Sequence, residues 1–452
     1  MSKKRQEALL LFTPEWNGMH PGAWRLPESP PDGAMDVETV VGLVQAAERA
    51  KFHALFLADA LGFRLEISPE ALARTGSGSR LEPFTLMAAL AMRTERIGLV
   101  LTANTTYDEP YHVARRFASL DHLSGGRCGW NIVTGGFPTG AKHFGRDVHV
   151  PHAERYARGA EFVAAVEALW DSWEDDAFLL DKASGLAFDP AKLHPPTLRG
   201  RHVTVTGPLN VSRPPQGRPV LAQAGSSATG REFAARFGEL IFTIQPDAEA
   251  GRKFRDSIRE AAAAQGRDPD HLKVLPSLTL VLGESEAEAQ ERSARLDQLA
   301  DPRVGIELLS AFLETDLTGL PLDVPLPAVG TATGTTSVQR YFVEKAEREG
   351  LAIGELIPFA LSFGSVVGTP EEIADRIEAW LDAGAADGFN VTFADLPRSM
   401  YLFVEQVIPE LRRRGRFHSE YEGRTLRESL GLPRPENRFA GRPGPAVVEI
   451  GI

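Results

Sequence analysis

The sequence predicts an α/β protein with a closed (β/α)8 barrel, the TIM-barrel fold, carrying insertions. Eight short apolar segments alternate with longer segments of helical periodicity, and no change of pattern breaks the series. The apolar segments are continuous rather than alternating, which is typical of parallel strands buried on both faces. Eight such units favour a closed barrel, and an open doubly wound sheet remains the alternative.

The elements follow one another in a regular order. Strands are expected at 8–12, 53–59, 96–104, 128–135, 218–225, 239–245, 274–283 and 388–393. Helices are expected at 36–52, 82–94, 110–124, 152–173, 228–238, 248–266, 285–300, 369–384 and 401–415. Asp36, Ser285 and Thr369 stand at helix starts as N-cap residue types, and Gly125-Gly126 ends the third helix.

One domain, residues 1–452, accounts for the whole series. It carries insertions at about 174–218 and 301–355, and the Gly-, Thr- and Pro-containing second insertion is expected to be a loop. The Pro- and Gly-rich end, about 416–452, is expected to be an extended tail.

Composition narrows the class of protein. The net charge of −12 disfavours binding to nucleic acid or to an anionic membrane surface. No apolar segment approaches membrane-spanning length, and the apolar run 8–12 is too short for a signal peptide. A single cysteine excludes an intrachain disulfide framework and fits a reducing environment, so a cytoplasmic location is expected.

Polar side chains follow the predicted strands at the ends where barrels of this class have their active sites. Most are uncharged amides or hydroxyls, without a metal-binding histidine pair, a strand-end lysine or a close carboxylate pair. Such a lining is typical of a site whose cofactor brings the chemistry, and a flavin fits because its pyrimidine edge pairs with amide-like groups. The candidates are Phe12, Thr13, Asp59, Thr102, Asn104, Asn131, Thr134, Gln223, Gly225, Thr243, Gln245, Ser277, Thr279 and Asp395.

Two further features extend this prediction. Gly225, Ser226 and Ser227 lie between a strand and a helix, where free N–H groups and two hydroxyls suit a mononucleotide phosphate; a simple serine N-cap is the alternative. His152 and Tyr156 share one helix face, by their i, i+4 spacing, at the rim of the barrel; packing at the surface is the alternative.

The glycine-rich stretch 123–142 has simpler explanations than nucleotide binding. Ala141 stands where a phosphate-binding loop requires lysine. Cys128 has no basic neighbour beyond Arg127 and is expected to be a buried apolar residue, and Asp59 has capping of the next turn as its alternative role.

Four motifs resemble a known family. They are "ARRFASLDHLSGGRCGWNIVTG", "PHAERYARGAEFVAAVEALWDSW", "PVLAQAGSSATGREFAAR" and "DGFNVTF", within a likeness that runs from about residue 8 to 438. They are similar to the bacterial-luciferase-like FMN-dependent monooxygenases, in the branch of the nitrilotriacetate, EDTA, dibenzothiophene-sulfone and long-chain alkane monooxygenases.

The resemblance implies a two-component monooxygenase. Reduced FMN would come from a separate NAD(P)H-dependent flavin reductase, and O2 would form a C4a-hydroperoxyflavin that oxygenates a small organic substrate. A homodimer or homotetramer is implied as well. The implied FMN contacts are Asp59 and Asn131 near the ring system, Ser226 and Ser227 at the phosphate, and also Thr102 or Asn104, His152 and Tyr156.

The chain also departs from its relatives. The alkane enzyme has a cysteine near the first strand, where this sequence reads "FTPEWNGMHPGAW", so alkane hydroxylation is not expected. His20 is the nearest polar catalytic candidate there. His143, in the loop 135–146, is the second, with a solvated loop histidine as the alternative. An F420- or FMN-dependent oxidoreductase and a non-catalytic flavin-binding protein stay open as alternative functions.

Overall fold

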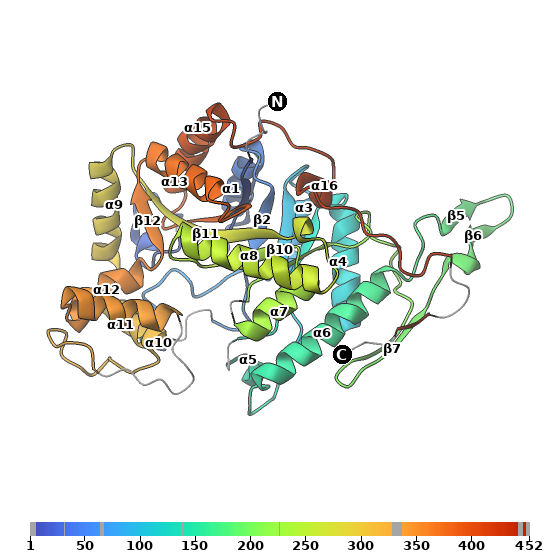
Figure 1. Cartoon of the computed structure of the whole chain (residues 1–452), viewed down its shortest axis with the longest axis horizontal. Helices are drawn as coiled ribbons and strands as arrows, with labels where there is room; N and C mark the ends of the chain where they lie inside the picture. The colour runs from blue at the N-terminus through green and yellow to red at the C-terminus, as the bar shows by residue number, and fades with distance from the viewer. Residues whose placement is uncertain are drawn as a thin grey trace.

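The computed structural model describes residues 6–30, 32–63, 67–136, 139–225, 227–327, 337–441 and 446–448 (Figure 1). Eight parallel strands form a ring that closes because β1 pairs with both β2 and β13, while β10 pairs with both β9 and β11. The predicted (β/α)8 barrel is therefore confirmed. The strands are β1 (Leu9–Phe12), β2 (Ala54–Leu57), β3 (Gly98–Asn104), β4 (Cys128–Val133), β9 (Val220–Gln223), β10 (Leu240–Thr243), β11 (Lys273–Leu282) and β13 (Gly388–Phe393).

Helices connect the strands and cover the outside of the ring (Figure 1). Asp36, Ser285 and Thr369 each accept hydrogen bonds from N–H groups of a first helical turn, so the predicted N-caps are confirmed. Gly125, at φ 67°, ends α4 in the left-handed conformation that glycine adopts without strain. The main helices are α1 (Val37–Arg49), α3 (Pro83–Ala91), α4 (Pro110–Ser124), α6 (His152–Trp170), α7 (Ala228–Phe237), α8 (Ala248–Ala264), α9 (Glu286–Leu299), α13 (Pro370–Asp382), α14 (Arg398–Leu402) and α15 (Ile408–Arg413), the last two joined by the π-helical segment Phe403–Val407.

The interior of the ring changes character along its axis. At the N-terminal ends of the strands, inward-facing apolar side chains such as Leu11, Phe56 and Val100 belong to one buried cluster. Leu426 and Leu430, from the C-terminal part of the chain, belong to the same cluster and close that end of the barrel. At the opposite end the inward positions are polar, and this end therefore provides the site.

The predicted extended tail is thus tightly packed and contains the short helix α16 (Leu426–Ser429). Arg427 is buried, and its guanidinium group donates hydrogen bonds to Glu239 Oε1 at 2.8 Å and Oε2 at 3.0 Å, just before β10. Arg438 Nε donates to Asp171 Oδ2 at 3.0 Å. These ion pairs fix the tail to the barrel.

The first insertion forms an arm on one side of the barrel, and the second lies on the opposite side (Figure 1). The arm contains the hairpin β5 (Phe178–Asp181) and β6 (Leu186–Phe188), and a sheet in which β7 (Pro196–Arg199) pairs with β8 (Thr204–Thr206) and β14 (Ala446–Val448). No helix among the described residues is long and apolar enough to cross a membrane.

The prediction of a loop at 301–355 is wrong for most of the described part of that segment, although 314–327 contains no helix or strand. The segment forms α10 (Pro302–Leu313), α11 (Ser337–Glu349) and the start of α12 (Ile353–Leu361), and the strand β12 (Ser365–Gly368) follows and pairs with β11. Asp301 caps α10, with Pro302 at its first turn. The helices form because Leu309, Phe342 and Leu356 bury their side chains in a second core of their own.

Candidate functional site

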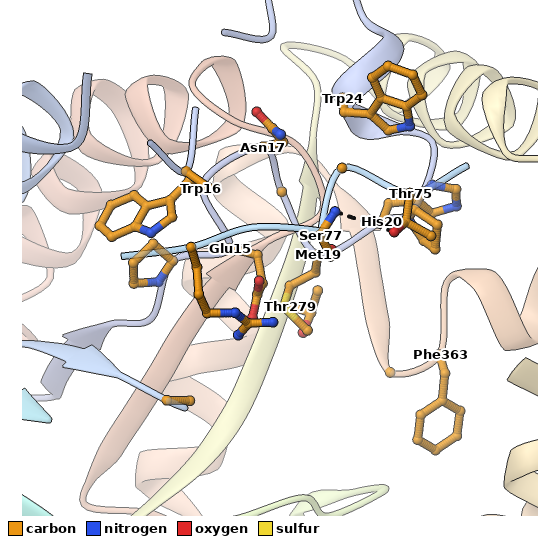
Figure 2. Close-up of a pocket in the computed structure, with 18 of the residues that line it drawn as sticks. Glu15, Trp16, Asn17, Met19, His20, Trp24, Thr75, Ser77, Thr279 and Phe363 are labelled. Atoms are coloured by element: carbon orange, nitrogen blue, oxygen red, sulfur yellow. Dashed lines mark hydrogen bonds between the residues drawn. The ribbon is translucent and has the colours of Figure 1, made fainter. Parts of the chain in front are cut away.

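A cavity of about 380 Å³ opens at the C-terminal ends of the strands. The segment after β1, the ends of β2, β10 and β11, and the loop 75–83 line it on the barrel side. Helices α10 and α12 complete it with Leu308, Phe312 and Leu361, and Phe363 follows from the next turn. Figure 2 shows Trp16 on one side of the space and Phe363 on the other, with Thr279 on the strand between them.

His20 lies against this cavity, as the sequence analysis expects of a catalytic candidate, but both of its ring nitrogens already have partners. Nδ1 accepts a hydrogen bond from the Gly22 N–H at 3.1 Å, and Nε2 lies 3.1 Å from Asp297 Oδ1. A nitrogen that accepts an N–H carries no proton, so Nε2 holds the ring proton and donates it to Asp297. His20 therefore ties the segment after β1 to α9.

Glu15, Asp59 and Arg80 are the charged residues among those that line the cavity, and Asp59 and Arg80 act on each other. Burial raises the pKa of the Asp59 carboxyl above its ordinary value, and the positive charge of Arg80 opposes that shift. Burial likewise lowers the pKa of Arg80, against the attraction of Asp59. The two charges thus influence each other in a partly desolvated space.

Thr102 joins three neighbouring strands at the mouth of the barrel. Its Oγ1 donates to the Leu57 carbonyl at 3.0 Å and accepts from the Asp59 N–H at 3.2 Å and from Asn131 Nδ2 at 2.8 Å. Asn131 Oδ1 is buried and has no hydrogen-bond partner among the described residues. An unpaired buried amide oxygen is costly, so this atom is suited to a donor from a ligand.

Asn104, the last residue of the same strand β3, has a local role that the sequence does not show. Its Oδ1 accepts hydrogen bonds from the N–H groups of Thr106 at 2.7 Å and Tyr107 at 3.2 Å. Its side chain therefore shapes the turn after β3.

The start of α7 forms a narrow cradle. A Cβ on Gly225 would lie 2.9 Å from Gly230 Cα, and a Cβ on Gly230 would lie 3.1 Å from Tyr156 Oη. Ser227 Oγ accepts the Gly230 N–H at 3.0 Å, which is the N-cap role left open as the alternative for Ser227. Ser226 lies outside the described residues. Glycines at this turn leave backbone N–H groups accessible at a helix N-terminus.

Tyr156 links this cradle to α6. Its ring packs on Phe233 of α7 with centroids 5.6 Å apart, and on the exposed His152 with centroids 4.8 Å apart. The predicted shared face of His152 and Tyr156 is present, directed at the start of α7.

The candidate residues therefore fall into two adjoining regions that meet at Asp59. Thr102 bonds to the Asp59 N–H and to Asn131 in the first region. In the second region, the cavity is lined by Asp59 together with His20, Gln245, Ser277 and Thr279. His143, in the short helix α5 (Thr139–His143), is exposed beside Gly62 and does not line the cavity.

Other expected strand-end residues form contacts within the protein that stabilise the barrel. The Thr134 carbonyl accepts from Thr106 Oγ1 at 2.7 Å, and Gln245 Nε2 donates to Thr243 Oγ1 at 2.7 Å. Gln223 lies beneath Gly225, with its Oε1 buried and unpaired. Asp395 is buried and pairs with Arg292 of α9 at 2.5 Å.

Sequence reasoning missed Arg80, Asn390 and Thr392. Asn390 Oδ1 accepts from Thr13 Oγ1 at 2.5 Å, and Thr392 Oγ1 lies 2.7 Å from Thr279 Oγ1. Their alternation within "GFNVTF" was the available signal, since residues two apart on a strand face the same side. No such pattern marks Arg80.

The described residues hold no group of three or more His, Cys, Asp or Glu arranged to bind a metal ion. Cys128 is buried, and burial raises the pKa of its thiol well above the ordinary value, as expected for an inert apolar residue. The strand ends thus present mainly amides, hydroxyls and backbone N–H groups beside an apolar-walled cavity.

Comparison with known proteins adds to this geometry. The profile of the luciferase-like monooxygenases matches residues 10–387. The chain belongs to this family. As a luciferase-like monooxygenase it is a flavin-dependent oxidoreductase, which agrees with strand ends suited to holding a cofactor.

Three relatives show how far the likeness extends. Component A of the nitrilotriacetate monooxygenase of Aminobacter aminovorans is 46% identical, over 94% of this chain and 96% of the relative. The N-acetyl-S-(2-succino)cysteine monooxygenase of Bacillus subtilis is 44% identical, over 97% and 99%. The structure of a riboflavin lyase with a modified FMN and riboflavin has a TM-score of 0.84 at 33% identity and covers 98% of both chains. This luciferase-like monooxygenase therefore matches its relatives over nearly its whole length.

Proposed function

We propose that this luciferase-like monooxygenase is the oxygenating component of a two-component system. It takes reduced FMN from a separate NAD(P)H-dependent flavin reductase and uses O2 to oxygenate a small organic substrate. The observation that carries this proposal is the junction at Asp59 of polar strand ends, with the unpaired Asn131 Oδ1, and an apolar-walled cavity. The first region suits a flavin and the second a substrate.

The residues present fit FMN. Asn131 Oδ1 would accept a hydrogen bond from the polar edge of the ring, with Thr102 holding the amide in place. Gly225, Ser227 and the N-terminus of α7 would hold the phosphate, because their N–H groups and the helix dipole favour an anion. When bound, reduced FMN supplies the activation of O2.

The chain's own contribution is to bind, orient and exclude water. Leu308, Phe312 and Phe363 place apolar surface over the space beside Asp59. A dry pocket strengthens every hydrogen bond within it and prevents side reactions with water. His20, with both nitrogens engaged, would fix the segment after β1 that forms one wall.

Flavin binding and oxygen consumption test the proposal. Purified protein is titrated anaerobically with reduced FMN, and separately with oxidised FMN and F420, and a substrate panel is then added in an oxygen electrode. We expect reduced FMN to bind more tightly than the other two and oxygen uptake to depend on it. Binding of reduced FMN no better than about millimolar, about −4 kcal/mol, would refute the proposal.

A matched pair of variants on β4 locates the flavin. Asn131→Leu removes the unpaired amide oxygen, and Cys128→Ala changes a buried side chain on the outer face of the same strand. We expect a loss of affinity for FMN of about tenfold in Asn131→Leu, because a hydrogen bond to a ligand is lost, and no change in Cys128→Ala. Equal affinities in the two variants would place the flavin elsewhere.

For assembly we propose a homodimer or homotetramer, supported by the resemblance to the family. Multi-angle light scattering of the purified protein distinguishes these from a monomer.

A further inference from the structure

Arg80 places a positive charge at the cavity. It is half-buried, it lines the cavity, and within the described part of the chain it makes no hydrogen bond and no ion pair. Asp59 attracts it only at longer range. A partly desolvated guanidinium group with free donors is costly unless an anion binds to it.

Three other polar groups that line the cavity already have partners. His20 uses both ring nitrogens, Thr279 pairs with Thr392, and Gln245 donates to Thr243. Arg80 is the cation among the described lining residues, and its guanidinium group carries five N–H donors. Its planar fork matches a carboxylate, which can accept two parallel hydrogen bonds from it.

The second insertion and the residues that follow it form an apolar wall of the cavity, in contrast to the charged Arg80. Leu308 and Phe312 of α10, Leu361 of α12 and Phe363 give it an apolar surface, and none of them carries a charge. A ligand that satisfies both walls has an anionic group at one end and an apolar body at the other.

We propose that Arg80 is a specificity-determining residue that binds a carboxylate group of the substrate, so that the substrate is an organic anion with an apolar portion. This inference rests on the proposed monooxygenase function. Arg80 would orient the apolar part toward the strand ends at Asp59, while the insertion covers it. The cation also attracts anions locally into a protein whose net charge is −12.

The test uses a panel of mono-, di- and tricarboxylates, including phenylacetate, with phenylacetamide as the neutral counterpart of phenylacetate. Binding to the FMN-loaded protein is measured by calorimetry and by the fluorescence of Trp16 and Trp24, which line the cavity. We expect at least one carboxylate to bind, and phenylacetate to bind about tenfold more tightly than its amide. The preference should weaken as salt is raised.

Three variants connect the preference to Arg80. Arg80→Leu should abolish it, and Arg80→Lys should retain part of it, because lysine keeps the charge but not the planar fork. Arg74→Leu is the matched control: Arg74 lies in the same inter-strand segment, pairs with Asp301 at 3.4 Å and does not line the cavity. It should leave the preference unchanged.

Several outcomes would overturn the proposal. They are an equal affinity of the wild type for phenylacetate and phenylacetamide, an unchanged preference in Arg80→Leu, and no binding by any carboxylate at about 10 mM. A loss of FMN affinity in Arg80→Leu with the carboxylate preference intact would assign Arg80 to the cofactor instead. FMN binding and oxygen uptake without substrate are measured in parallel, so failure of the proposed function is distinguished from failure of this inference.

Discussion

Replacing Thr102 with valine tests the hydrogen-bonded junction at the barrel mouth. Valine has nearly the same shape but removes the hydroxyl that serves the Leu57 carbonyl, the Asp59 N–H and Asn131 Nδ2. Thr102 is only 7% exposed, so water cannot replace those bonds fully. At about 1 kcal/mol for each bond, we expect a loss of about 3 kcal/mol in the free energy of unfolding.

The corresponding change in melting temperature follows from chain length. Unfolding entropy is about 2.1 cal/mol/K per residue, which for 452 residues gives about 1 kcal/mol per degree. Thr102→Val should therefore lower Tm by about 3 °C in differential scanning calorimetry. Its affinity for FMN should fall too, because Asn131 loses the group that holds its amide.

Thr279→Val is the control for this experiment. Thr279 of β11 is also a buried threonine that lines the barrel mouth, but among the described residues its hydroxyl bonds only to that of Thr392, at 2.7 Å. We expect a decrease in Tm of about 1 °C. Equal decreases in the two variants would refute the view that Thr102 joins three strands.

Three further predictions concern other parts of the molecule. Arg427→Met should lower the free energy of unfolding by about 2–3 kcal/mol in calorimetry, because the partly buried Glu239 loses its ion-pair partner. An unchanged Tm would contradict the anchoring of the tail. Asp59→Asn should raise Tm at neutral pH, because the raised pKa of Asp59 means that the fold disfavours the carboxylate. This gain should shrink as the pH falls through the raised pKa and disappear well below 3.8, where the carboxyl is protonated in both states. A gain that is constant with pH would exclude this cause. Gly230→Ala should weaken FMN binding, since the new Cβ would lie 3.1 Å from Tyr156 Oη within the proposed phosphate site. Its Tm should change little, because alanine favours the helix. Unchanged affinity for FMN would exclude α7 as the phosphate site.

Most of the barrel could be predicted because its signal is local. A buried parallel strand is a continuous apolar run, and residues such as Asp36 and Thr369 mark helix starts within a few positions of the sequence. The second insertion resembles a loop in sequence because its middle contains Gly, Thr and Pro, although Asp301 and Pro302 mark the capped start of α10. Its helices are also stabilised by burying Phe342 and Leu356 in a separate core, which is a long-range effect.

The candidate site was only partly accessible to sequence reasoning. Strand-end residues such as Thr102 and Asn131 could be located because the fold determines where strand ends meet. Arg80 lies in a loop, "TGSGSRLEP", and its place in the cavity depends on how that loop packs against the insertion. Whether a polar group has a partner, as for His20, likewise depends on residues far away in the sequence, here Asp297.

The way in which the ring closes has a consequence for biosynthesis. Strand β1 pairs with β13, so Leu9 finds its neighbour Gly388 only when most of the chain has left the ribosome. At about 5–20 residues per second, the first strand waits on the order of half a minute, and Leu426, which closes the bottom of the barrel, emerges later still. The ring is therefore closed late in synthesis, long after its first four strands and their helices have been made.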